Sequence, residues 1–190
     1  MAEKRYQPAP QESPLRSLNR HITTHDESNG KAIFSNEVPE QTTTQLVPSA
    51  VFRQGYVTKK FPVQLNGGED LDTYKSFLES PPGLVSGGGT VLRIVDMHPA
   101  CTSPMHRTVS LDYGIVLEGE VDLVLDSGEV RSMKRGDIAI QRGTMHAWRN
   151  NHPTEWARVA FVLQPCEPVE VGGKQLGEDY GDMEGVKHSE

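Results

Sequence analysis

The sequence predicts an all-β protein, a small antiparallel barrel with one short helix. Between residues 90 and 164 the chain consists of short apolar, β-branched segments separated by Gly, Pro and Asp turns, a pattern typical of sandwiches and barrels. The 18 Gly and 13 Pro suit a turn-rich β protein better than a helical bundle. With 190 residues and 35% hydrophobic content, the chain can bury one such core.

The elements can be assigned in chain order. Residues 19–24 and 31–35 flank the turn signal Asn29-Gly30 and predict a β-hairpin. Residues 70–78 predict the helix, because apolar side chains recur at helical spacing behind an acidic first turn. The Gly-rich residues 83–89 predict a mobile connector. Strands are expected at residues 50–58, 90–97, 105–108, 113–118, 120–125, 130–133, 137–141, 146–150 and 158–163.

Composition divides the chain into three parts. Residues 1–18 are polar and proline-rich and predict a flexible arm. Residues 19–164 hold nearly all the apolar periodicity and predict the barrel domain. Residues 165–190 carry seven acids against two lysines, so we expect this acidic tail to remain solvated and disordered.

Charge and hydropathy exclude two classes of partner. The net charge is −7 and no clustered basic face is visible, which argues against nucleic-acid binding. No window approaches the ~18 apolar residues of a membrane span, and the N-terminus has no apolar signal segment. Cys101 and Cys166 are too few for a disulfide framework, so we expect free thiols and a cytoplasmic protein.

The stretch from residue 104 to 150 is the most informative and reads PMHRTVSLDYGIVLEGEVDLVLDSGEVRSMKRGDIAIQRGTMHAWRN. It resembles the two-part signature of the cupin family. The positions that match this signature are His106 and Gly119 in the first part and Gly136, Gly143, His146 and Asn150 in the second. The chain departs from it at Thr108 in place of a second His, at Asp112 in place of Glu, and at Gln141-Arg142 in place of the Pro step.

The resemblance implies a cupin-type double-stranded β-helix, or jelly-roll, barrel with a divalent metal in its cavity. Carried over position by position, it leaves His106, Asp112 and His146 as ligands for Fe, Mn or Zn. Two imidazoles and one carboxylate form a facial triad with open coordination positions. The alternative is a metal-free cavity in which both histidines bind substrate or transfer protons and Asp112 is a turn residue.

Strand alternation extends the candidate site. Side chains two residues apart share a face of a strand, so Thr108 should accompany His106 into the cavity, and Trp148 should accompany His146. Arg93, in an apolar strand, is a candidate partner for a substrate carboxylate or phenolate. His98 is either an extra ligand, a general base or a surface residue. The expected catalytic residues are His106 and His146, and the expected substrate contacts are Thr108, Arg93, Tyr113 and Trp148.

Residues 19–164 are similar, more closely, to the cupin-domain oxidoreductases of fungal polyketide clusters that make salicylaldehyde-type metabolites. This implies a tailoring enzyme that oxidises or reduces a polyketide-derived small molecule. The alternatives are a metal-independent dehydratase or isomerase that uses His as acid and base, and a ligand-binding protein without catalysis. Cupins often pair their barrels through N-terminal strands, so the resemblance also implies a homodimer formed through residues 19–35, an isolated hairpin that needs a sheet or partner to cover it.

Overall fold

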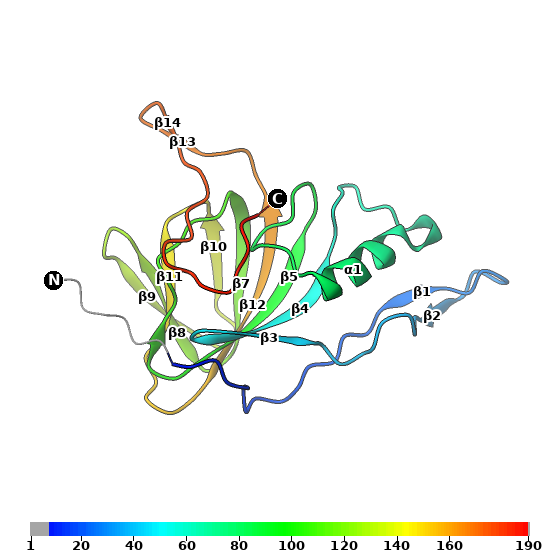
Figure 1. Cartoon of the computed structure of the whole chain (residues 1–190), viewed down its shortest axis with the longest axis horizontal. Helices are drawn as coiled ribbons and strands as arrows, with labels where there is room; N and C mark the ends of the chain where they lie inside the picture. Colours follow the sequence, from blue (N-terminus) through cyan, green and yellow to red (C-terminus); the bar gives the residue numbers. More distant parts are fainter. Residues whose placement is uncertain (1–7, 190) are drawn as a thin grey trace.

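The computed structural model describes residues 8–189 and shows two antiparallel sheets that form a barrel, with one α-helix on its flank (Figure 1). A six-stranded sheet has the order β10-β7-β12-β5-β4-β3, and a four-stranded sheet has the order β6-β11-β8-β9. Two further pairs, β1-β2 and β13-β14, extend from this body. The prediction of an all-β barrel with an N-terminal hairpin and one short helix is confirmed.

The elements have the following bounds. The strands are β1 (Thr23–His25), β2 (Ala32–Phe34), β3 (Thr44–Val47), β4 (Ala50–Val57), β5 (Val91–Met97), β6 (Cys101–Thr102), β7 (Ser110–Glu118), β8 (Glu120–Leu125), β9 (Val130–Lys134), β10 (Ile138–Arg142), β11 (His146–Asn150), β12 (Ala157–Pro165), β13 (Glu170–Val171) and β14 (Lys174–Gln175). The helix α1 spans Glu69–Glu79 and follows a short 3-10 turn, Asn66–Gly68.

One predicted strand is wrong. Residues 105–108 do not form a strand; His106 makes only an isolated antiparallel bridge to His146. Pro104 contributes to this result, because proline has no N–H to donate to a sheet and restricts the residue before it. The sequence patterns also failed to predict β3, β6, β13 and β14, which have two to four residues each.

The apolar interior consists of two clusters. One lies between the two sheets, where Val116, Trp148 and Val159 are among its buried members. The other joins α1 to the barrel through Tyr74 and Phe77, together with side chains of β4, β5 and β12. The second cluster also contains Tyr180, from the far end of the chain. The barrel core therefore extends into segments at both ends of the sequence.

The acidic tail is ordered against the barrel, in contrast to the expectation that it is disordered, although most of its residues are exposed. After the hairpin β13-β14 the chain returns across the molecule (red in Figure 1), and Asp179 forms a bridge with Arg107. Tyr180 is buried. At the other terminus, Gln11 and Arg16 also contact barrel residues. None of the helices formed by residues 8–189 has both the length and the apolar composition that a bilayer span requires.

Candidate functional site

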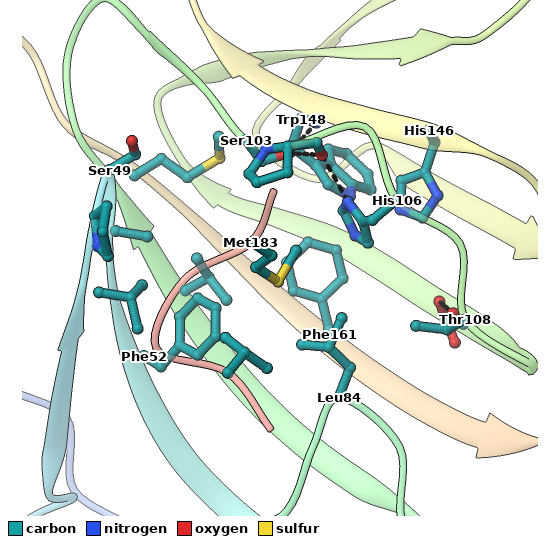
Figure 2. A pocket seen from close by; sticks show the side chains of 18 of the residues that line it. Ser49, Phe52, Leu84, Ser103, His106, Thr108, His146, Trp148, Phe161 and Met183 are labelled. Atoms are coloured by element: carbon teal, nitrogen blue, oxygen red, sulfur yellow. Dashed lines mark hydrogen bonds between the residues drawn. The ribbon is translucent and has the colours of Figure 1, made fainter. Parts of the chain in front are cut away.

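The barrel encloses a cavity between its two sheets and the returning tail (Figure 2). Most of its wall is apolar. The polar side chains of the described residues that line it come mainly from the segments of the sequence signature. Those from the signature segments are His106, Thr108, Asp112, Gln141 and His146; Ser49, Ser103 and Glu184 also line the cavity, and its apolar wall includes Phe52, Val95, Met97, Trp148, Phe161 and Leu163. An apolar cavity with a few convergent polar groups is the usual form of a small-molecule site.

His106 and His146 lie side by side. Their backbones exchange both hydrogen bonds of the bridge, with N to O distances of 2.8 Å from His106 and 2.9 Å from His146. Their ring centroids are 4.4 Å apart. Both side chains are buried, at 8% and 3% exposure. The bridge thus brings two residues forty positions apart in the sequence into one pair.

Each of these rings is fixed by a backbone carbonyl. The Nδ1 atom of His106 lies 2.8 Å from the carbonyl oxygen of Pro104, and the Nδ1 atom of His146 lies 2.9 Å from that of Thr144. A carbonyl oxygen only accepts, so each Nδ1 carries the proton and donates. In the neutral ring this leaves Nε2 unprotonated, with a lone pair that can accept a proton or bind a metal.

The environment keeps both rings neutral. Burial lowers the pKa of His106, and burial together with the neighbouring His106 lowers the pKa of His146 to about 3. The bonds to the Pro104 and Thr144 carbonyls act in the opposite direction but do not outweigh burial. Neutral imidazoles at physiological pH leave Nε2 able to accept a hydrogen bond or a proton from a bound molecule, although the lowered pKa makes each ring a weaker base than an exposed histidine.

Asp112 has its carboxylate held by hydroxyl groups. Ser110 Oγ lies 2.5 Å from one carboxylate oxygen and Thr108 Oγ1 lies 3.2 Å from the other. Burial raises the pKa of Asp112 to about 6, against the lowering effect of both hydroxyl groups. Ser110 and Asp112 share the inward face of β7 by strand alternation. Asp112 therefore belongs to a small hydroxyl–carboxyl network on the cavity wall.

Gln141 is a cavity residue that the sequence analysis noted only as a departure from the signature. It pairs with Asp112 across β10 and β7, and its Oε1 accepts a hydrogen bond from Thr144 at 2.5 Å. Its Nε2 is buried and has no hydrogen-bond partner within residues 8–189. Alternation could have revealed it, because Ala139 and Gln141 are buried while their neighbours on β10 are exposed.

The donor groups do not match the three-ligand metal site that the family resemblance implies. Within residues 8–189, no three His, Cys, Asp or Glu side chains come close enough together to hold a metal ion. The Asp112 carboxylate is engaged by Ser110 and Thr108, and Thr108 supplies a hydroxyl where the signature has an imidazole. The described residues thus offer two imidazole donors, whereas the site implied by the resemblance has three ligands, His106, Asp112 and His146.

The expected substrate contacts divide into two groups. Thr108 and Trp148 line the cavity. Tyr113 is not among the lining residues, because it alternates with the inward Asp112 on β7. Arg93 is also outside the lining; it is buried, with Nη2 2.8 Å from the Gly83 carbonyl oxygen and its guanidinium over the Phe52 ring.

His98 also lies away from the cavity lining and is buried. Its ring lies against that of Trp156, tilted by 40° with centroids 4.0 Å apart, and its Nδ1 is 3.0 Å from Gln11 Nε2. The prediction of a surface position for His98 is therefore wrong. Its ring is also absent from the cavity lining that contains His106 and His146.

The chain has clear relatives. The family model for the cupin domain matches residues 93–162. Phomopsin biosynthesis cluster protein D of Diaporthe leptostromiformis is 51% identical over 168 residues, which cover 87% of this chain and 88% of the relative. Oryzines biosynthesis cluster protein J of Aspergillus oryzae is 42% identical, with 93% and 97% covered. The cupin-domain-containing oxidoreductase fogC of Aspergillus ruber is 41% identical, with 87% and 83% covered.

Among solved structures, the polyketide cyclase RemF from Streptomyces resistomycificus is 22% identical, with a TM-score of 0.41 and with 63% of this chain and 66% of that chain covered. The family assignment depends instead on the relatives above, which match nearly the full length of the chain, and on the signature residues that line the cavity. The chain belongs to the cupin family and is related to cupin-domain-containing oxidoreductases and to other proteins of fungal secondary-metabolite biosynthesis clusters.

Proposed function

We propose that this protein is a tailoring enzyme of a fungal secondary-metabolite pathway, and that it acts on an apolar small molecule bound in the barrel cavity. In this proposal His106 and His146 transfer the protons of the reaction. The observation that carries the proposal is the pair of buried, neutral imidazoles, each fixed through Nδ1 and each with Nε2 available, in a mostly apolar cavity.

The names of the relatives support an oxidoreductase reaction for this chain, since four proteins of this kind are 33% to 42% identical to it. Proton transfer is also required by the alternative reactions, a dehydration or an isomerisation. The proposed role of the histidine pair therefore holds for both classes. A polyketide-derived substrate stays a prediction, because the names of the clusters do not identify the scaffold on which this chain acts.

The wall of the cavity supports particular substrate contacts. We propose that Trp148 and Phe161, whose rings lie edge to face at 5.1 Å, pack against the apolar part of the substrate. Thr108 and Gln141 are the polar groups that can orient it. Arg93 and Tyr113 would act on a substrate only through the residues they contact. Binding of Fe, Mn or Zn would require donors beyond the two histidines, for the reason given above.

The experiment that tests this function compares the metabolites of the source organism with and without the gene. Loss of the gene should cause one small molecule to accumulate, and the wild-type gene should restore its conversion. The double variant His106→Ala/His146→Ala should not restore it. The matched control is His25→Ala, because His25 is an exposed histidine on β1. Full restoration by the double variant would refute the proposed function.

We also propose that the protein forms a homodimer through the hairpin β1-β2. The hairpin extends away from the barrel beyond α1 (Figure 1) and has exposed apolar side chains, Ile33 at 46% and Phe34 at 65%. These two side chains lie on opposite faces of β2, so neither face of the hairpin is covered in the single chain. A two-stranded hairpin is marginal in water and gains stability when a partner covers it.

A further inference from the structure

The end of the chain forms part of the cavity wall. Residues 177–189, which we call the strap, contribute Met183, Glu184 and Val186 to the lining. Figure 2 shows the strap as a coil across the cavity, with the Met183 side chain directed toward Phe161. Met183 and Val186 also pack against the cluster that contains Leu163. The cavity as described is therefore incomplete without the strap.

The strap begins beside the histidine pair. Arg107 and Asp179 exchange two backbone hydrogen bonds, with N to O distances of 2.6 Å and 2.9 Å. The Arg107 side chain adds a third, from Nε to the Gly177 carbonyl oxygen at 2.7 Å. Since Arg107 directly follows His106, this first anchor joins the strap to the segment that holds the site.

A second anchor is the buried Tyr180. Its hydroxyl accepts a hydrogen bond from the Leu84 backbone N–H at 3.1 Å and lies 2.8 Å from Ser189 Oγ. Burial raises the pKa of Tyr180 to about 12, so the phenol stays neutral. Leu84 is itself positioned by the Arg93 guanidinium, which donates to the neighbouring Gly83 carbonyl. Arg93 thus supports the strap rather than the cavity surface.

Between the anchors the strap turns twice at glycine. Gly181 and Gly185 have φ angles of 56° and 76°, values that favour glycine. A Cβ atom at position 181 would lie 2.8 Å from the Met105 carbonyl oxygen. The Gly185 carbonyl accepts a hydrogen bond from Gln45 Nε2 at 2.8 Å. The short loop between these glycines directs Met183 into the cavity.

We propose that the strap closes the substrate cavity and that Met183 sets the size of molecule the cavity accepts. The strap is held by hydrogen bonds near its two ends and by the side chains of Tyr180, Met183 and Val186, and most of its residues are exposed, whereas the barrel strands form continuous ladders. Segments with few buried contacts open at a lower free energy than core strands. The strap can therefore open to admit a molecule while the barrel stays folded. The proposal rests on the proposed function only in treating this cavity as the substrate site.

The first test measures how accessible Trp148 is to acrylamide, with Trp156 replaced by Phe so that Trp148 is the single fluorophore. Gly181→Ala should displace the strap, because the new methyl meets backbone and φ is positive. We expect its quenching constant to rise by about twofold or more while the melting temperature stays close to that of the parent. Gly177→Ala is the matched control, since a Cβ there meets no atom within 4 Å. Equal quenching in the two variants would overturn the proposal.

The second test measures binding of 4-alkylphenols of increasing chain length by calorimetry. Met183→Ala should shift the preferred chain to longer members, with a gain of about threefold to fourfold for each added CH₂ that the new space buries. Met183→Leu, of similar volume, should keep the wild-type preference. The same length preference in Met183→Ala and wild type would show that Met183 does not set the size. Because both tests measure accessibility or binding rather than turnover, they fail independently of the proposed catalytic role of the histidines.

Discussion

His106 and His146 form a backbone-bridged pair whose imidazole rings lie 4.4 Å apart, centroid to centroid, in the cavity wall. Each ring donates its Nδ1 proton to the carbonyl of the residue two positions earlier, Pro104 or Thr144. In both segments a hydrogen bond to a nearby backbone carbonyl therefore selects the same tautomer, with the proton on Nδ1. The account of the site depends on this relationship, because it makes both Nε2 atoms acceptors at once.

The first prediction concerns the protonation of this pair. Both pKa values are lowered from 6.5, so neither ring should gain a proton as the pH falls through 6.5. Nitrogen-15 NMR of histidine-labelled protein should show both rings neutral, with the proton on Nδ1. A cavity ring that titrates with a pKa near 6.5, or that carries its proton on Nε2, would contradict the assignment.

The second prediction concerns Asp112, whose pKa is raised from 3.8 to about 6 by burial. Between these pH values the folded protein binds more protons than the unfolded chain, so the free energy of unfolding falls as the pH rises. The raised pKa of Asp112 changes the free energy of unfolding by about 3 kcal/mol at most over this pH range. Asp112→Asn removes it, and the variant should gain stability relative to wild type from pH 3.8 to pH 6.

Urea denaturation at several pH values in this range measures the difference. Ser132→Ala, at an exposed position on β9, is a suitable control because it leaves the cavity carboxyl intact. If Asp112 were a metal ligand its pKa would be lowered instead, and the Asn variant would lose stability relative to wild type as the pH rises. That opposite slope would refute the role of Asp112 in the hydroxyl–carboxyl network.

The third prediction concerns metal. The described residues supply two imidazole donors and no third His, Cys, Asp or Glu ligand beside them, whereas resident sites of this type use at least three protein ligands. We expect dialysis against EDTA to leave turnover unchanged. Metal analysis should also give the same content for wild type and His106→Ala. A stoichiometric metal that is lost together with activity, and that restores activity when added back, would contradict this prediction.

The fourth prediction concerns assembly. Sedimentation should give twice the chain mass of 21.0 kDa at micromolar concentration. Phe34→Asp places a charge on the exposed apolar face of β2 and should weaken association by about tenfold or more. Glu27→Ala, in the turn of the same hairpin, should leave the mass unchanged. A monomer in the wild type, or a dimer of undiminished affinity in Phe34→Asp, would show that the hairpin is not the interface.

Much of the barrel could be predicted because its signals are local. Period-two alternation and Gly or Asp turns located β4, β5 and β7 to β12 within a few residues. The same alternation placed Trp148 on the cavity wall; Thr108 also lines the cavity, although its segment is not the strand that the prediction assumed. The signature located the histidine pair. Apart from the histidine pair, the residues that decide these structures are close to one another in the sequence.

The tail could not be predicted for the opposite reason. Its acidic, glycine-rich composition is typical of a solvated segment, and Tyr180 and Met183 are isolated apolar residues with no periodicity. The tail is ordered by contacts of Tyr180 with Leu84 and of Asp179 with Arg107, about 70 to 100 positions away. The expected contact of Arg93 with the substrate was not found for the same reason, since the position of its side chain behind Phe52 depends on the loop at Gly83. Long-range contacts of single residues leave no local pattern.

The most direct test of the central claim is the turnover of the purified protein on the compound that accumulates when the gene is absent. His106→Ala and His146→Ala should each reduce turnover by at least about 100-fold, the lower end for loss of an acid–base group. Both variants should keep the far-ultraviolet circular dichroism of the wild type, and His25→Ala should keep full turnover. Wild-type turnover in either folded cavity variant would contradict the assignment of the histidine pair as the catalytic group.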